Sequence, residues 1–302
     1  ETTLRGYKFS YDGLNRLIKA DYAEDGSFST NLGRYTEQLS YDKHGNVLTL
    51  KRFGKQSSGY GLIDDLSLSY SGNQIKTVSD SATDPIYQGA FNFVNGANTS
   101  KEYFYDNSGN MTIDYNKKIA KIQCNTLNLP EKIQFSFGNT INYQYGADGK
   151  KRSVTYITST TNLLVPMGTI LPIPPNQVAS TIRTDYCENL VYENMVLNKI
   201  LIDDGYVTLS GSTPAYHYYL KDYLGNNRVV ISQTGTVEQV NHYYPFGGLF
   251  GEGIATSNQP YKYNGKELDR MHGLDLYDYG RRFYDPALAQ FQTTDPLAED
   301  YY

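Results

Sequence analysis

The chain has 302 residues, and its 27 Lys and Arg against 32 Asp and Glu give a net charge of −5. This acidic balance argues against a nucleic-acid partner, because neutralising phosphates requires a basic face. The most apolar run, residues 163–173, is interrupted by Pro166 and Pro172 and is too short to span a bilayer, so we expect no membrane span.

Composition also limits the chemistry that the chain can carry. The two cysteines, Cys124 and Cys187, are too few for a disulfide framework. We expect two buried thiols, with a single disulfide as the alternative. Neither the four histidines nor the cysteines have metal-ligand spacing, so no metal or cofactor is expected.

A short phrase, Tyr-Asp-x-x-Gly-Asn, recurs along the first half. It is complete at residues 41–46 and 105–110, carries Asn15 in place of the glycine at 11–16, and is shortened at 70–73. An Asp at the start of a turn can accept hydrogen bonds from the backbone two residues on, and a Gly three residues later can take positive φ. Each phrase therefore predicts a β-hairpin tip. The residues that define the two complete copies are Tyr41, Asp42 and Gly45, and Tyr105, Asp106 and Gly109.

The segments between the tips alternate apolar and polar residues, as half-buried strands do. Residues 66–70, 133–137 and 141–145 are the clearest examples, and no segment has a sustained helical stripe. The sequence predicts an all-β chain of antiparallel hairpin repeats. Since one repeat cannot bury its own apolar face, the repeats should stack into a continuous curled or spiral sheet.

Three segments are predicted along the chain. Residues 1–158 carry the hairpin repeats, residues 159–182 form a connector rich in Thr and Pro, and residues 183–302 return to strands but contain different sequence motifs. Prolines cannot join a central ladder, so the connector is expected to be a loop or an edge excursion.

The second half contains several ordered blocks, at residues 217–229, 243–247, 261–269, 273–286 and 295–297. With these blocks the chain resembles the RHS/YD-repeat family: the first half resembles its YD repeats, and the second half resembles the RHS-repeat-associated core domain, in a Bacteroidetes-like form. The chain starts at Glu1 and its core stops early, so we expect a C-terminal fragment of a longer protein. The core residues that carry the resemblance are Asp222, Gly225, Asn226, Arg228, Gly265, Glu267, Arg281, Tyr284, Asp285, Pro286, Asp295 and Pro296.

The resemblance implies a function as well as a fold. In the family, a wall of hairpins spirals into a hollow shell that encloses a C-terminal polypeptide, often a toxin, in secreted or cell-surface bacterial proteins. The expected partners are therefore the chain's own C-terminal cargo and a secretion apparatus or cell-surface partner. The core residues would fix hairpin tips and close the shell, which predicts a structural protein without catalytic activity.

Two alternatives remain open. Many relatives cut themselves through two aspartates, each in an Asp-Pro-x-Gly motif, and the first motif maps onto Asp295 and Pro296, with Ala298 in place of the glycine. The second motif would lie beyond Tyr302, and Asp285 is a nearby carboxylate. An aspartic mechanism needs two carboxylates that share a proton, so self-cleavage is expected, if at all, only in the intact protein. The other alternative is a cell-surface adhesin that binds glycans or proteins.

Overall fold

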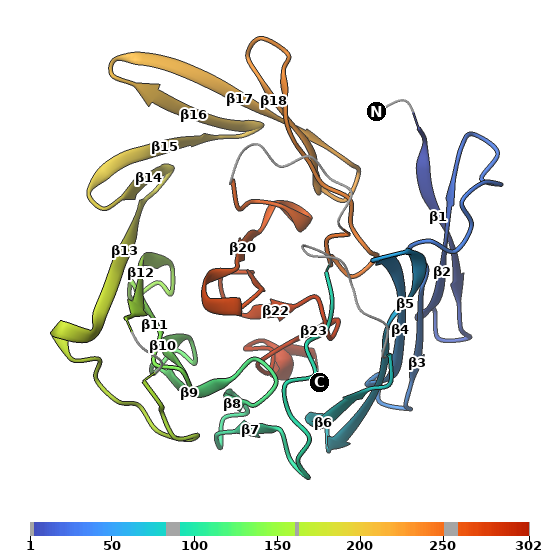
Figure 1. Ribbon diagram of the computed structural model, residues 1–302, viewed down its shortest axis with the longest axis horizontal. Coiled ribbons are helices and arrows are strands. Elements are labelled where there is room, and N and C mark those ends of the chain that lie inside the picture. Colours follow the sequence, from blue (N-terminus) through green and yellow to red (C-terminus); the bar gives the residue numbers. More distant parts are fainter. Residues whose placement is uncertain (1–2, 83–90, 161–162, 251–258, 302) are drawn as a thin grey trace. The chain divides into compact units, whose positions relative to one another are not determined.

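The structure is a computed structural model that describes residues 3–82, 91–160, 163–250 and 259–301 (Figure 1). Within these ranges the chain consists of strands, turns and four short 3-10 helices. Every strand pair in the described part of the chain is antiparallel. The all-β prediction is confirmed.

The strands form three sheets, and in each sheet the strand order follows the chain order. The first sheet consists of β1 (Arg5–Tyr11), β2 (Leu17–Glu24), β3 (Glu37–Tyr41), β4 (Val47–Gln56), β5 (Gly59–Ser71) and β6 (Gln74–Asp80).

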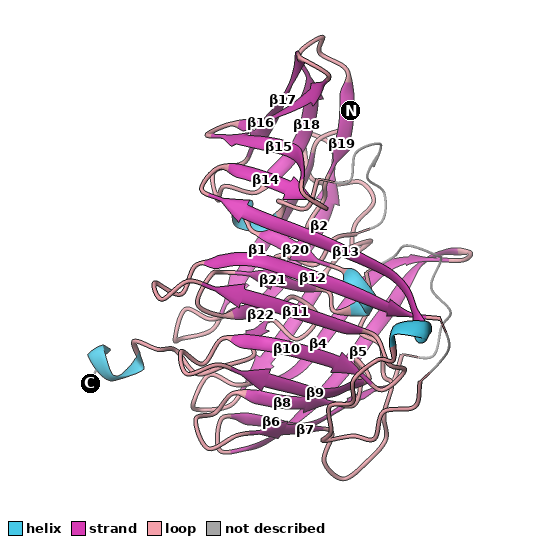
Figure 2. Cartoon of the chain, turned by 90° about the vertical axis from the view of Figure 1, so that its left-hand side faces the viewer, coloured by secondary structure: helices cyan, strands magenta, loops and turns pink. Residues whose placement is uncertain are grey.

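The second sheet has thirteen strands (Figure 2). They are β7 (Tyr103–Tyr105), β8 (Met111–Asp114), β9 (Ile119–Cys124), β10 (Pro130–Phe135), β11 (Thr140–Tyr145), β12 (Lys151–Ser159), β13 (Val178–Cys187), β14 (Leu190–Glu193), β15 (Val196–Ile202), β16 (Gly205–Ser210), β17 (Thr213–Lys221), β18 (Asn227–Ser232) and β19 (Val237–Val240).

The third sheet is formed by strands within residues 267–291, in the segment that resembles the RHS-repeat-associated core. It consists of β20 (Glu267–Asp269), β21 (Leu276–Asp278), β22 (Phe283–Asp285) and β23 (Gln290–Phe291). The 3-10 helices are η1 (Pro175–Gln177), η2 (Tyr263–Gly265), η3 (Met271–Gly273) and η4 (Ala298–Tyr301).

The connector predicted over residues 159–182 is shorter in the structure. Strand β12 continues to Ser159, and β13 already begins at Val178. Six residue pairs from Ser153↔Asp185 to Thr158↔Ser180 run in unbroken register between the two strands. The ladder therefore continues across the Pro-rich excursion, of which residues 161–162 lie outside the described residues.

The chain divides into two compact units. The first contains residues 1–102, 242–253 and 286–289, and the second contains residues 103–241, 254–285 and 290–302. Both units thus combine repeat residues with core-block residues, unlike the segments predicted from composition. The reason is the unbroken ladder between β12 and β13, which keeps the later repeats with the strands that follow them.

The core of the first unit is aromatic. Tyr22, Tyr35, Ile63, Tyr244 and Phe250 form one buried cluster, in which the rings of Tyr35 and Phe250 stack with centroids 4.0 Å apart. The Tyr244 hydroxyl donates to the Phe53 carbonyl at 2.7 Å. The core block around Tyr244 is therefore an integral part of this unit.

In the second unit, the long sheet curves and the four-stranded sheet lies on its inner side (Figure 1). Buried contacts join the two sheets: the rings of Tyr143 on β11 and Phe283 on β22 are 5.5 Å apart. The short strands β20–β23 thus cover the inner face of β9–β12.

Both cysteines are free. Cys124 is partly buried, and burial raises the pKa of its thiol to about 11. The expectation of two buried thiols is wrong for Cys187, which is exposed because β13 ends there in a turn with Glu188 at φ 54°.

Candidate functional site

The recurrent phrase forms the hairpin tips that the turn chemistry predicts. The Asp42 Oδ1 atom accepts from the backbone N–H of His44 at 2.8 Å and of Asn46 at 2.9 Å. Gly45 has φ 90° and donates its N–H to the Asp42 carbonyl. Asp106 with Gly109 (φ 82°) and Asp222 with Gly225 (φ 78°) repeat this geometry.

The final Asn of the phrase has a role that sequence reasoning missed. The Asn46 Nδ2 donates to the Asp42 Oδ2 at 2.8 Å, and Asn226 donates to Asp222 at 2.9 Å in the same way. Asn110 makes the matching bond to its own aspartate. All three copies keep the order Asp-x-x-Gly-Asn, and this order could have indicated the role of the Asn. Its amide lies where the second carboxylate oxygen needs a donor.

The same Asn side chains also connect successive tips. Asn110 Nδ2 donates to the Asn128 Oδ1 at 2.9 Å, and the Asn226 Oδ1 accepts from the Asn264 N–H at 2.7 Å. Asn128 belongs to a tip that the phrase did not predict, in which Asn125 replaces the Asp and Asn128, at φ 58°, replaces the Gly. Asn can fill both positions because its side chain mimics a turn and tolerates positive φ.

Two tyrosines of the phrase bond the preceding hairpin. The Tyr41 hydroxyl donates to the Leu17 carbonyl at 2.7 Å, and the Tyr70 hydroxyl donates to the Val47 carbonyl at 2.8 Å. Both carbonyls belong to the first residue of the strand after the previous tip. Tyr105 is the last residue of β7, half-buried, at the same position relative to its own tip.

Core-block residues support one more tip and a backbone contact. Arg228 lies 4.0 Å from the Asp222 carboxylate, and Gly265, at φ 66°, closes the tip next to Asn226. The Arg281 Nη2 donates to the Asp148 carbonyl at 3.0 Å. Arg228 and Gly265 thus lie at hairpin tips, and Arg281 contacts the backbone of another turn.

A buried lysine joins the long sheet to the four-stranded sheet. The Lys151 Nζ lies 2.7 Å from both the Glu267 Oε2 and the Asp278 Oδ2. Burial lowers the pKa of Lys151, but the two carboxylates more than offset burial, and the pKa lies well above its usual value. The Tyr186 hydroxyl donates to the other Glu267 oxygen at 2.7 Å.

Asp269 is a second polar link between these sheets. Its Oδ2 accepts from the hydroxyls of Tyr143, at 2.8 Å, and Tyr156, at 3.0 Å. Burial raises the pKa of the Asp269 carboxyl to about 6, although these bonds oppose the shift. No local sequence pattern indicates this contact, because its partners are more than a hundred residues apart in the chain.

The two aspartates considered for self-cleavage have different surroundings. Asp295 forms an ion pair with Arg282 at 2.7 Å, and its Oδ1 accepts from the Leu297 N–H, while Pro296 is exposed. Asp285 is buried at the end of β22 and lies 3.3 Å from the Lys117 Nζ. Each carboxylate is thus held by its own cation.

The residues on either side of Asp285 belong to different units: Tyr284 to the second and Pro286 to the first. The Tyr284 ring is buried, with its centroid 5.3 Å from that of Phe291. The Pro286 carbonyl faces the Arg52 Nη2 at 3.4 Å in the first unit.

Arg52 itself is the centre of a buried charge cluster that the sequence did not reveal. Its guanidinium pairs with Glu37 at 3.0 Å and with Asp64, and all three side chains are fully buried. Glu37 and Arg52 are direct partners in the β3–β4 register, which places both on one face of the sheet. In the sequence, the only local indication of this cluster was the alternation of residues along β3 and β4, which suggests that one face of these strands is buried.

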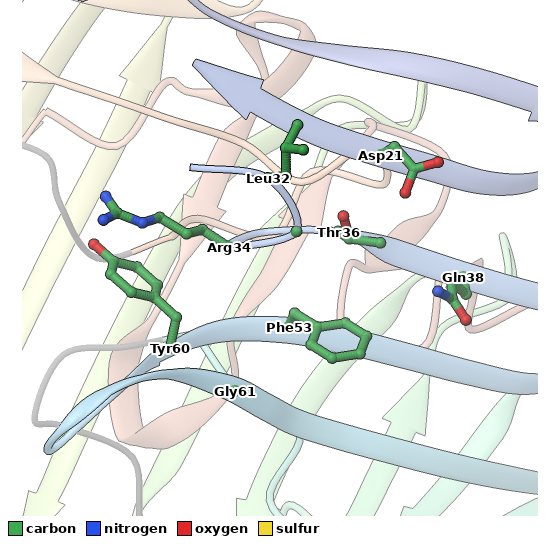
Figure 3. Close-up of a pocket in the computed structure, with 9 residues that line it drawn as sticks. Asp21, Leu32, Arg34, Thr36, Gln38, Phe53, Tyr60 and Gly61 are labelled. Atoms are coloured by element: carbon green, nitrogen blue, oxygen red, sulfur yellow. The ribbon is translucent and has the colours of Figure 1, made fainter. Parts of the chain in front are cut away.

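A pocket of about 360 Å³ opens on the opposite face of this sheet (Figure 3). Gln38 follows Glu37 on β3, so its side chain points away from the Arg52 cluster, and Thr36 immediately precedes the strand. The guanidinium of Arg34 lies 4.3 Å from the centre of the Tyr60 ring. Asp21, Leu32, Gly33, Phe53 and Gly61 complete the lining.

Within the described residues, no group of three or more His, Cys, Asp or Glu side chains is arranged to hold a metal ion. In the same part of the chain, no helix has the length and apolar character needed to cross a membrane.

This hairpin array is an RHS-like fold. The Photorhabdus luminescens Tc holotoxin pore matches 98% of this chain and 17% of that chain, at 16% identity and a TM-score of 0.51. The crystal structure of TcdB2-TccC3-TEV matches 97% of this chain and 17% of that one, at 16% identity and a TM-score of 0.45. No protein-family model matches the chain.

One curated relative is an animal surface protein. Salivary gland surface protein 1 of Aedes aegypti is 26% identical over 206 residues, which cover 66% of this chain and 6% of that protein. The chain thus spans a small part of the proteins it matches.

Proposed function

We propose that the chain is a non-catalytic wall segment of a secreted or cell-surface bacterial RHS/YD-repeat shell, which encloses or presents a polypeptide located C-terminal to the core. The observation that best supports this proposal is the packing of one sheet on another within the second unit. There, four short strands made by the core blocks lie on the inner side of the thirteen-stranded sheet and are tied to it by Lys151 and Asp269.

The use of polar residues supports a structural role. The aspartates of the tips bond their own turns, Tyr41 and Tyr70 bond the preceding hairpin, and Lys151 pairs with carboxylates across two sheets. Asp295 and Asp285, the two candidates for self-cleavage, are paired with different cations. An aspartic mechanism would require two carboxylates that share one proton.

The proposal is tested on the full-length protein encoded by the gene. Its C-terminal polypeptide should resist a protease while the shell is folded and should be digested rapidly once the shell is unfolded. The same polypeptide expressed alone is the control. Equal digestion of the enclosed and the isolated polypeptide would contradict enclosure.

The absence of catalysis is tested in the same preparation. The full-length protein and its Asp295→Ala variant should give the same set of fragments on denaturing mass spectrometry. A fragment that forms in the wild type and disappears in the variant would instead establish a self-cleaving core that releases the cargo.

The pocket of the first unit favours one second candidate, a glycan-binding adhesin. Aromatic rings can stack on sugar faces, and the Tyr60 and Phe53 rings lie in one pocket with the polar groups of Arg34, Gln38 and Asp21 (Figure 3). Saturable binding on a glycan array that is lost in the Tyr60→Ala variant would support this function, and an array without binding would remove it.

A further inference from the structure

Three ionisable side chains interact electrostatically between the long sheet and the four-stranded sheet of the second unit. Lys117 lies in the turn between β8 and β9, Asp114 ends β8, and Asp285 ends β22. The Lys117 Nζ is 3.3 Å from the Asp285 Oδ2, and the two side chains are 16% and 2% exposed. An amine and a carboxyl group from two different sheets are therefore held in contact, largely out of water.

Asp114 is the third member. Its residue is 1% exposed, and its Oδ1 accepts from the Lys117 N–H at 2.9 Å. Its Oδ2 is buried, and none of the residues that the structure describes donates a hydrogen bond to it. Because burying a charged oxygen without a partner costs more than burying a neutral one, burial favours the protonated form of this carboxyl.

Lys151 provides a contrast within the same unit. Its ammonium contacts both surrounding carboxylates at 2.7 Å, and Glu267 has a further donor in Tyr186. That arrangement is a complete ion-pair network. At Lys117, by comparison, one carboxylate is in contact and the second keeps an oxygen without a donor.

We propose that Lys117 and Asp285 join covalently, forming an amide between the Nζ and the Cγ with loss of one water molecule, while Asp114 relays the proton. The reaction needs no oxidant, reductant or cofactor, because an ammonium and a carboxylate contain all the atoms of an amide and one water.

The step balances as follows. A proton moves from the Lys117 ammonium to the Asp285 carboxylate, which leaves a neutral amine and a neutral acid. The amine lone pair attacks the Cγ and forms the C–N bond. The second nitrogen proton passes through the Asp114 carboxyl to the departing hydroxyl, the C–O bond breaks, and water leaves.

The pKa values are consistent with this order of events. Burial raises the pKa of Asp114 to about 6, so this carboxyl can carry a proton near neutral pH. Burial lowers the pKa of Lys117, but Asp285, Asp114 and Asp275 more than offset burial, so the resting state is the ion pair. Asp275 is itself paired with Arg270 at 2.8 Å. Proton transfer out of the ion pair should therefore limit the rate, and the bond should form slowly after folding.

The bond would tie the β8–β9 turn to the end of β22. It would thus fasten the four-stranded sheet to the long sheet without depending on ionic strength or pH. Such a fastening suits a wall that must stay closed outside the cell, and it goes beyond the proposed structural function.

The test is the mass of the purified 302-residue chain under denaturing conditions after prolonged incubation. The expected mass is that of the sequence less one water. A tryptic digest should contain one branched peptide that joins the Lys117 and Asp285 segments, with no cleavage after Lys117. Cleavage after Lys151 should remain, as the internal control.

Variants separate the roles. Asp285→Ala should have the full sequence mass, and Asp114→Asn should slow the loss of water at least tenfold. Asp285→Asn should still join, with loss of ammonia in place of water. A wild-type chain of full sequence mass that trypsin cuts after Lys117 would overturn the proposal, and unchanged kinetics in Asp114→Asn would overturn the proton relay.

Discussion

At the residue scale, the tips depend on backbone conformations that few side chains adopt. Gly225 has φ 78°, and a Cβ added there would meet no atom within 4 Å. Substitution at this position therefore costs backbone strain alone. Gly13 occupies another tip, is equally open, and does not have positive φ. The two glycines form a matched pair.

We expect Gly225→Ala to destabilise the protein by about 1 kcal/mol or more, because an L residue is strained in the left-handed region. Gly13→Ala should change stability by less than about 0.5 kcal/mol. Urea unfolding of the two variants provides the comparison. Equal midpoints would show that positive φ at Gly225 does not limit the stability of its tip.

Turn chemistry at this scale was largely predictable from the sequence. Asp42 and Gly45 have the hydrogen bonds and the φ value that their spacing indicates. The role of Asn46 was not predicted, because it depends on a side-chain contact with the second carboxylate oxygen. The tip at Asn125 was missed for a simpler reason: two substitutions by Asn hide the phrase although they preserve its geometry.

At the element scale, the tyrosines of two phrases, Tyr41 and Tyr70, connect one hairpin to the previous one. The Tyr70 hydroxyl bonds the Val47 carbonyl, and the Tyr41 hydroxyl bonds the Leu17 carbonyl. Tyr11 begins the first phrase, and its side chain is 57% exposed. Tyr41 and Tyr70 thus connect neighbouring hairpins as well as filling the strand face.

Tyr70→Phe removes only the hydroxyl and leaves the Val47 carbonyl without its partner. We expect a loss of about 1 kcal/mol in unfolding free energy. Tyr11→Phe, at the exposed copy, should have an effect within about 0.5 kcal/mol. Chemical denaturation of both variants tests the difference, and a neutral Tyr70→Phe would argue that the ring alone joins the hairpins.

The strands themselves were predictable from alternation, whereas their long-range partners were not. The pattern in residues 133–137 and 141–145 predicted β10 and β11. Nothing local indicates that Lys151 on β12 meets Glu267 and Asp278 across two sheets. Such pairs depend on the curvature of the long sheet and on the path of the chain through the four-stranded sheet. Neither can be read from a short stretch of sequence.

At the scale of the whole molecule, the division into two units also escaped prediction. The sequence predicts one continuous sheet in which the connector at residues 159–182 does not separate independent folds, whereas the chain divides into two units, with boundaries after residues 102 and 241. No boundary falls at the connector, because hydrogen bonding between β12 and β13 continues past the prolines. In the second unit, the packing of the two sheets depends on buried polar groups, and these groups make its stability depend on pH.

Asp269 gives that dependence a definite sign. Its pKa rises from 3.8 to about 6 on folding, mainly through burial, so the folded state binds its proton more tightly than the unfolded state does. The carboxyl therefore contributes stability below about pH 4, and this contribution is lost as the pH rises to 6 and above. Since one pKa unit corresponds to about 1.4 kcal/mol, the change is on the order of 3 kcal/mol.

Asp269→Asn keeps an oxygen to accept from Tyr143 and Tyr156 but cannot titrate. Urea unfolding between pH 4 and pH 7 should show the wild type losing stability relative to this variant as the pH rises, whereas parallel profiles would mean that Asp269 is as well solvated in the folded protein as in the unfolded chain.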